Sequence, residues 1–373
     1  MSPPGEVEFF VDSGTVPATD EDAVDLGQTQ VPRWALVLVV VLIAGLLMTM
    51  AAQTRHKPVA TATPQPLPIV ASPASTSGLG APIPFGRASP ALDLGATVPI
   101  FVLESGRLYR VTDTTAVGVN LDGPGFTRIG TPPRLVVDAA ANRAWVVPID
   151  TPDADIVEFD AGNLHRLRTL HSRESVRDTA ALGGHLYLAR STGLADVTPG
   201  ATAPTLLPVL GGFVASVAAD PKRHRLLALV LNVGASMQQI TVGGTVPGAH
   251  ASVPVAGGNV RVTQDGAIWL AGFGSATAGA VVLRLDPKTL RPLLTSAVAA
   301  RLGASSRIES AGDRDIWVRS AGDGEGLWCV DGRSGSILQH WPSVRGPVAS
   351  VEGVAFASME GALVPLVLDG CTG

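Results

Sequence analysis

From about residue 91 onward, the chain repeats a turn followed by a short strand centred on one large residue. The centres are Tyr109, Trp145, Tyr187, Leu227, Trp269, Trp317 and Phe356, spaced by 36, 42, 40, 42, 48 and 39 residues. Six of the seven are aromatic, although the chain has only six tryptophans, two tyrosines and nine phenylalanines. A period of about 40 residues built from short strands is typical of propeller blades. The sequence therefore predicts an all-β fold, a seven-bladed β-propeller, with six blades as the alternative.

A second register follows the first, in which an apolar residue and an aspartate precede a turn. The pairs are Leu121-Asp122, Phe159-Asp160, Leu285-Asp286, Val330-Asp331 and Leu368-Asp369. Aspartate at such a position accepts hydrogen bonds from the backbone of its own turn. The alternative, a ring of metal ligands, requires the carboxylates to converge, whereas these would lie at separate blade edges. We therefore expect turns between third and fourth strands, and no metal site.

The last repeat, from Val348 onward, ends after three strands, which would leave an unpaired edge. Just before the first repeat lies the alternating segment ALDLGATV, residues 91–98. We expect this segment to pair with the last blade and to close the ring, because closure removes the exposed edge.

Residues 34–52, WALVLVVVLIAGLLMTMAA, contain no charged side chain and lie between Arg33 and Arg55. A helix of this length covers about 28 Å, close to the hydrocarbon thickness of a bilayer. A cleaved secretory signal is the alternative, but its apolar run is shorter and its leader is short and basic. The sequence predicts one transmembrane α-helix acting as a signal-anchor.

This span divides the chain into four parts: an acidic disordered tail (1–33), the helix (34–52), a linker rich in Pro, Ala, Ser and Thr (53–90), and the propeller domain (91–373). The tail holds seven acidic residues and one arginine, a formal charge of −6, against −5 for the whole chain. The remainder is nearly neutral, which argues against nucleic-acid binding. The basic residues that flank the span weakly favour a propeller in the cytoplasm, but large domains cross the membrane regardless of nearby charge. We expect the N-terminus in the cytoplasm and the propeller outside the cell.

Four arginines precede the repeat centres by eight to eleven residues: Arg134, Arg177, Arg261 and Arg307. This spacing places them at the starts of first strands, which line the central channel of a propeller. A set of guanidinium groups at one channel mouth would bind carboxylates, phosphates or an acidic partner loop. Asp178 and Glu309 lie nearby and could neutralise them, and the alternative is a set of separately solvated arginines.

Other candidate chemistry is sparse. Cys329, on a third strand, and Cys371, near the end of the next repeat, lie on adjacent blades and could form a disulfide; two buried thiols are the alternative. The seven histidines fall at differing places in the repeat, and no HExxH, GxSxG or Walker-type motif occurs. We expect no catalytic residues, no metal and no cofactor.

The motifs DGAIWLAG, DRDIWVRS and LRLDPKTLRPLL resemble bacterial propeller repeats of the NHL and YVTN type, including those of the streptogramin lyase-like group. This resemblance covers residues 91–373 and implies architecture rather than activity. No residue matches the His and Glu constellation of the lyase-like members. We expect a membrane-anchored module outside the cell that binds a protein or an anionic small molecule. The alternative is a lyase- or hydrolase-like propeller enzyme acting at the channel mouth.

Overall fold

A computed structural model gives the architecture of the chain. It describes residues 79, 83–84, 99–104, 106–112, 116–121, 126, 133–244, 248–275, 279–303, 306–312, 314–320, 325–344, 348–351, 354–359 and 362–366. All of these belong to one compact unit, residues 71–373.

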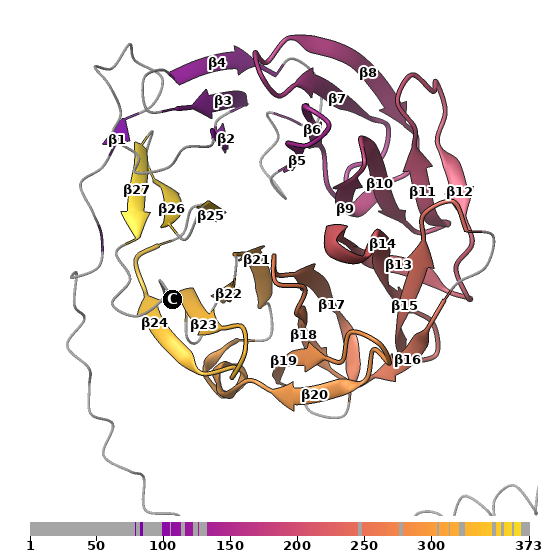
Figure 1. Ribbon diagram of the computed structural model, residues 1–373, viewed down its shortest axis with the longest axis vertical. Helices are drawn as coiled ribbons and strands as arrows, with labels where there is room; N and C mark the ends of the chain where they lie inside the picture. The colour runs from indigo at the N-terminus through magenta and orange to yellow at the C-terminus, as the bar shows by residue number, and fades with distance from the viewer. Residues whose placement is uncertain are drawn as a thin grey trace, which may run out of the picture. The chain divides into compact units, whose positions relative to one another are not determined.

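The described residues form small antiparallel sheets arranged in a ring, each with one strand toward the centre (Figure 1). The first three four-stranded sheets, from inner to outer strand, are β5 (Arg134–Asp138), β6 (Arg143–Val147), β7 (Ala154–Asp160), β8 (Arg166–Ser172); β9 (Val176–Leu182), β10 (His185–Arg190), β11 (Gly193–Val197), β12 (Thr205–Leu207); and β13 (Phe213–Asp220), β14 (Arg225–Leu231), β15 (Ala235–Thr241), β16 (His250–Val253). The next two are β17 (Val255–Val262), β18 (Ile268–Gly274), β19 (Ala280–Leu285), β20 (Pro292–Thr295) and β21 (Arg307–Ala311), β22 (Asp315–Ser320), β23 (Gly326–Asp331), β24 (Ile337–Trp341). The sixth runs β25 (Val348–Val351), β26 (Val354–Met359), β27 (Ala362–Leu366), β1 (Ile83–Pro84).

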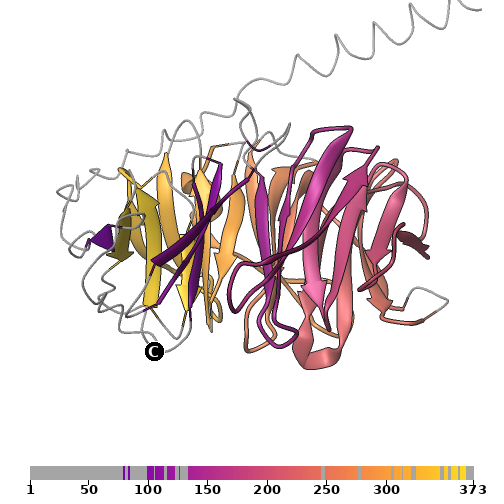
Figure 2. The ribbon, with the colours of Figure 1, turned by 90° about the horizontal axis from the view of Figure 1, so that it is seen from above.

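These six sheets are blades of a β-propeller, which confirms the all-β propeller prediction. A further sheet has three strands, β2 (Ile100–Glu104), β3 (Arg107–Val111) and β4 (Ala116–Asn120). The described residues thus complete six blades rather than the seven expected. Two 3-10 turns, η1 (Pro221–Arg223) and η2 (Ala297–Arg301), connect strands. In the perpendicular view, the strands run between the two faces of the ring (Figure 2).

The repeat centres occupy equivalent places in the ring, as the sequence predicts. Each lies on the second strand of its sheet: Tyr109 on β3, Trp145 on β6, Tyr187 on β10, Leu227 on β14, Trp269 on β18, Trp317 on β22 and Phe356 on β26. All are buried, Tyr109 at 9% exposure and the other six at 1% or less. Large side chains on these strands fill the space between neighbouring sheets, so the repeat follows from packing.

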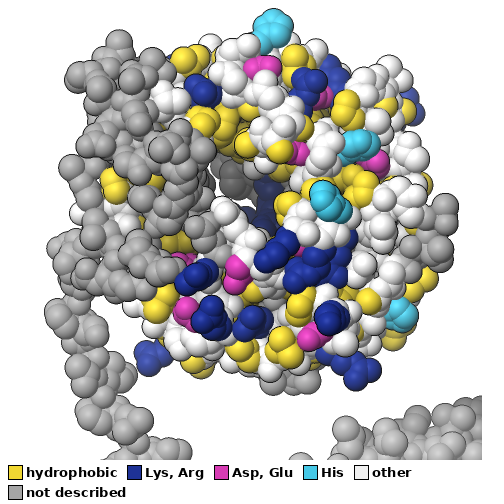
Figure 3. Space-filling view, viewed as in Figure 1, with side chains coloured by type: hydrophobic (Ala, Val, Ile, Leu, Met, Phe, Trp, Pro, Cys, Tyr) yellow, Lys and Arg dark blue, Asp and Glu magenta, His cyan; other side chains and the backbone are white. Residues whose placement is uncertain are grey.

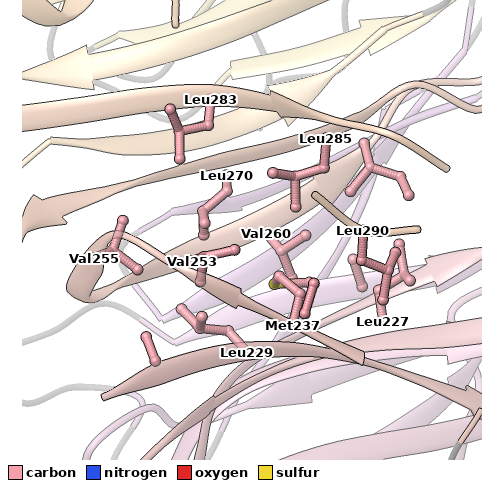
Figure 4. Close-up of a cluster of buried hydrophobic side chains, with 14 residues drawn as sticks. Leu227, Leu229, Met237, Val253, Val255, Val260, Leu270, Leu283, Leu285 and Leu290 are labelled. Atoms are coloured by element: carbon pink, nitrogen blue, oxygen red, sulfur yellow. The ribbon is translucent and has the colours of Figure 1, made fainter. Parts of the chain in front are cut away.

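The hydrophobic core is divided among the blade interfaces. One cluster joins the sheets β13–β16 and β17–β20, with Leu227, Met237 and Val253 from the first sheet against Val260 and Leu270 from the second (Figure 4). Each four-stranded sheet is therefore covered on both faces by the adjacent sheets of the ring. This explains why the strands are apolar along most of their length instead of alternating strictly.

The aspartate turns confirm the second register of the sequence. Asp160 Oδ1 accepts hydrogen bonds from the amides of Gly162 (2.9 Å) and Asn163 (3.1 Å), in the turn from β7 to β8. Asp286 and Asp331 do the same in the equivalent turns after β19 and β23. These amide hydrogen bonds hold the pKa of the Asp286 carboxyl below its usual range. Asp122 and Asp369 lie outside the described residues.

The ring is closed by a segment that precedes the first repeat, but not by the one expected. The outer strand of the last blade is β1, in which Ile83 pairs with Leu363 and Pro84 with Ala362. Leu79 adds an isolated bridge to Leu366. Residues 91–98, which we expected in this position, lie outside the described residues, and the segment that pairs comes from the stretch assigned to the linker. A proline is tolerated there because the outer side of an edge strand needs no amide donor.

The described residues include no helix long and apolar enough to span a membrane. The predicted tail, transmembrane helix and most of the linker lie outside the described residues.

Candidate functional site at the channel mouth

The inner strands of the sheets follow one another around the central channel. β2, β5, β9, β13, β17, β21 and β25 each contact the next, and β25 contacts β2. A space-filling view shows an opening at the centre of the ring with Lys and Arg side chains at its wall (Figure 3). We call the end at which the inner strands begin the strand-start mouth.

Four consecutive inner strands share an irregularity near this mouth. In β9, β13, β17 and β21 the pairing with the second strand skips one residue, namely Arg177, Ala215, Ala256 and Glu309. An extra residue in one strand bends it and redirects the side chains around it. At β9 and β21 the extra residue is charged, so the register shift places an ionisable side chain at the mouth.

Asp178 is the centre of the polar network at this mouth. Its side chain is almost fully buried, and it accepts hydrogen bonds from Arg134 on β5 and Ser216 on β13. Arg261 on β17 adds two more, from Nη1 to Oδ2 (3.0 Å) and from Nη2 to Oδ1 (3.3 Å). One carboxylate therefore joins the inner strands of four blades. Buried charge is tolerated when it is paired and hydrogen-bonded in this way.

The network continues to the fifth blade through buried neutral groups. The Ser216 hydroxyl also accepts from the Val260 amide (3.0 Å). The Asn259 side chain donates to the Ile308 carbonyl (2.7 Å) and accepts from the Ile308 amide (3.0 Å). Side chains thus link neighbouring inner strands, which belong to different sheets and form no backbone ladder with one another among the described residues. This polar belt fixes the spacing of β5, β9, β13, β17 and β21.

A second ion cluster lies on the blade of β21. Glu309 Oε1 accepts from Arg307 Nε (2.6 Å) and from Arg319 Nε (3.0 Å) on β22. Burial raises the pKa of the Glu309 carboxyl, but Arg307 and Arg319 lower it more, so the net pKa lies below its ordinary value. Arg307 keeps 41% of its side chain exposed. Two guanidinium groups thus share one carboxylate in this cluster.

Arg177 is different, because its guanidinium is exposed and packs on an aromatic ring. Val176 and Asp178 on either side of it are both buried. The Arg177 Cζ lies 5.2 Å from the centre of the Phe213 ring, a cation–π arrangement. Among the described residues, Arg177 forms no ion pair within 4.0 Å. The carbonyl of the residue before it, Val176, accepts a hydrogen bond from the backbone amide of Asp150.

The structure brings three of the four predicted arginines into ion pairs and leaves the fourth exposed. Arg134 and Arg261 share Asp178, Arg307 pairs with Glu309, and Arg177 lies on Phe213. Arg261 is not at the start of its strand as expected; it is the penultimate residue of the eight-residue β17. Its long side chain nevertheless brings its guanidinium to the level of Asp178.

Several residues of this mouth were not identified from the sequence. Ser216, Asn259 and Phe213 carry no repeat signal, because only one blade has each side chain at its position. Arg319 could have been found, since it lies two residues after the repeat centre Trp317 and faces Arg307 in the strand register. Once the repeat centres are aligned, the sequence shows which residues of a second strand lie opposite those of the first strand.

The described residues include one of the two cysteines, Cys329. No group of three or more His, Cys, Asp or Glu side chains within them is arranged to hold a metal ion. Cys329 is buried on β23, the third strand of its blade, as predicted. Cys371 lies outside the described residues, so the disulfide stays a prediction.

Comparisons with known proteins identify the fold. No family model and no curated protein sequence matches this chain. The WD40 propeller domain of Doa1 is similar in structure, at 13% identity over 77% of this chain and 95% of that one, with a TM-score of 0.50. The propeller domain of Cps50 (Swd1) from Myceliophteria thermophila is 13% identical over 78% of this chain and 99% of that one, also at 0.50. The structure of YCF48 bound to D1 peptide is 16% identical over 77% and 98%, with a TM-score of 0.44. The two matches with a TM-score of 0.50 show a shared fold alone, and the NHL and YVTN resemblance stays a prediction.

Proposed function

We propose that this protein is a propeller module that binds an acidic segment of a partner protein at the strand-start mouth. The observation that carries the proposal is the charge balance there: among the described residues, the four guanidinium groups of Arg134, Arg177, Arg261 and Arg307 have two carboxylates, Asp178 and Glu309, as ion-pair partners. Excess guanidinium groups on a rigid rim favour carboxylates, which they bind with charge-assisted hydrogen bonds. A propeller suits this role because its inner strands hold the groups in fixed positions.

The ring supporting this mouth has, in our proposal, seven blades. The three-stranded sheet β2-β3-β4 carries the repeat centre Tyr109 on its second strand, as the six complete blades carry theirs. Its inner strand β2 contacts both β5 and β25. We assign it as the seventh blade for these two reasons.

We further propose that the module is anchored in a cell membrane and faces the outside. The support is the uncharged stretch 34–52 and the Pro-, Ala-, Ser- and Thr-rich linker 53–90. Protease added to intact cells should remove the propeller and spare the acidic tail. Protection of the propeller would place it in the cytoplasm and change the pool of partners.

The binding proposal is tested with the full-length chain in nanodiscs and short fluorescent peptides. We expect glutamate-containing peptides to bind more tightly than peptides in which glutamine replaces each glutamate, with an affinity that falls as salt is raised. Inorganic phosphate is included as a small-anion probe. Equal affinity for the glutamate and glutamine peptides would refute the proposal, and tighter binding of phosphate than of any peptide would replace the protein partner by a small anion.

A further inference from the structure

The guanidinium of Arg177 packs on Phe213, and two further exposed apolar side chains lie on the chain connections next to that residue's strand pair. Phe213, on which it packs, is the first residue of β13 and pairs with Leu231 of β14. The connection preceding β13 carries Leu210, which is 49% exposed, and the turn after β14 carries Val233, which is fully exposed. We call Arg177, Leu210, Phe213 and Val233 the Arg177 patch.

Hydrogen bonds and a close approach fix the connection that carries Leu210 next to the turn that carries Val233. Leu210 is fixed from both sides, because its amide donates to Gln238 Oε1 (2.8 Å) and its carbonyl accepts from Gln238 Nε2 (2.7 Å). The glycine that follows it, Gly211, lies against the side chain of Asn232, the neighbour of Val233. Gln238 is itself buried on β15, the third strand of the blade. The apolar side chains are thus presented on an anchored connection.

We infer that the Arg177 patch binds a partner segment in which a carboxylate lies beside apolar side chains. This inference rests on the proposed function and names the chemistry of its partner. A purely acidic segment would match Arg177 and leave Leu210 and Val233 in water. A purely apolar segment would cover those side chains and would leave the guanidinium without its hydrogen-bond acceptor, which costs affinity.

The guanidinium is suited to this task by its surroundings. Arg134 and Arg261 are committed to Asp178, and Arg307 to Glu309, whereas the described residues provide no carboxylate for Arg177. Stacking on Phe213 restricts the side chain before a partner arrives, so less conformational entropy is lost on binding. Charge complementarity therefore selects an acidic occupant, and the adjoining apolar surface selects an acidic segment with apolar neighbours.

The test uses three peptides of equal length: one with glutamate and leucine, one with glutamate and serine, and one with glutamine and leucine. We expect the first to bind the full-length chain about tenfold more tightly than either of the others, since both its contacts are made. Arg177→Ala should weaken the first peptide about tenfold and leave the glutamine–leucine peptide unchanged. Val233→Ser should reduce the advantage of leucine over serine without affecting the fold, because this side chain makes no buried contact.

Matched controls lie on the outer rim of the ring, at β20. Arg291 is exposed, and Leu293 is 55% exposed on that strand. Arg291→Ala and Leu293→Ser should bind all three peptides like the parent. If Arg177→Ala and Arg291→Ala have equal effects, the inference is wrong. If glutamate peptides bind but leucine gives no advantage, the inference is also wrong while the proposed function stands; if no glutamate peptide exceeds its glutamine counterpart, both are wrong.

Discussion

Asp178 offers the sharpest test of how the mouth is built. The change Asp178→Asn keeps the shape of the side chain and removes its charge, leaving Arg134 and Arg261 near each other without a counter-charge. Removing one member of a buried ion pair costs about 3–5 kcal/mol. The two guanidinium groups keep 23% and 18% of their side chains exposed, so water in the channel offsets part of the loss. We expect the free energy of unfolding to fall by about 3 kcal/mol.

For a domain of this size, that loss corresponds to a melting temperature lower by roughly 6–12 °C. Circular dichroism of the full-length chain during heating, with urea titration for the free energy, measures both. The control is Asp153→Asn, because Asp153 is 75% exposed and lies 3.8 Å from His171; we expect less than about 0.5 kcal/mol there. Adding Arg261→Gln to Asp178→Asn should recover part of the loss. If Asp178→Asn costs no more than the control, the carboxylate does not hold the inner strands together.

Three further changes test other parts of the account. Glu309→Gln should lower the free energy of unfolding by about 1–2 kcal/mol at neutral pH, since Arg307 and Arg319 lose the charge of this carboxylate. Because the pKa of the Glu309 carboxyl is depressed in the folded protein, the difference in stability between parent and variant should be full above pH 4.5 and should disappear as the pH falls further. A constant difference in melting temperature down to pH 3 would contradict this. Asp160→Ala should cost about 1 kcal/mol in urea unfolding through the lost turn hydrogen bonds, with Asp160→Asn milder, and equal stability of all three proteins would show that the turn needs no cap. Deleting residues 79–84 should lower the melting temperature by about 5 °C, whereas a deletion of equal length at 61–66 should not; equal effects would argue against closure by β1.

The architecture could be predicted from the sequence because it depends on a repeated packing requirement. Every blade needs one large side chain at the same place on its second strand, and Trp145, Trp269 and Trp317 satisfy it in sequence-visible positions. The aspartate turns are local, since Asp160 bonds to amides two and three residues away. Both signals survive in a single sequence without reference to distant residues.

The closing strand and the polar belt depend on long-range contacts, and the sequence does not display them. The closing strand consists of only two residues, Ile83 and Pro84, within a proline-rich stretch that resembles a linker. The longer alternating segment at 91–98 was therefore the stronger candidate for the closing strand. The pairing of Asp178 with Arg261 joins residues 83 positions apart, on two blades that are separated along the chain by the blade of β13. Such a contact depends on how the inner strands lie around the channel, which a repeat count does not reveal.

A charge exchange tests the central claim most directly, namely that Arg177 provides the guanidinium with which the mouth selects its partner. The binding of the glutamate–leucine peptide and of a lysine–leucine peptide is measured for the parent protein and for Arg177→Glu. The account predicts that the parent prefers the glutamate peptide and that Arg177→Glu prefers the lysine peptide, with unchanged melting temperature. The same preference in both proteins would contradict it.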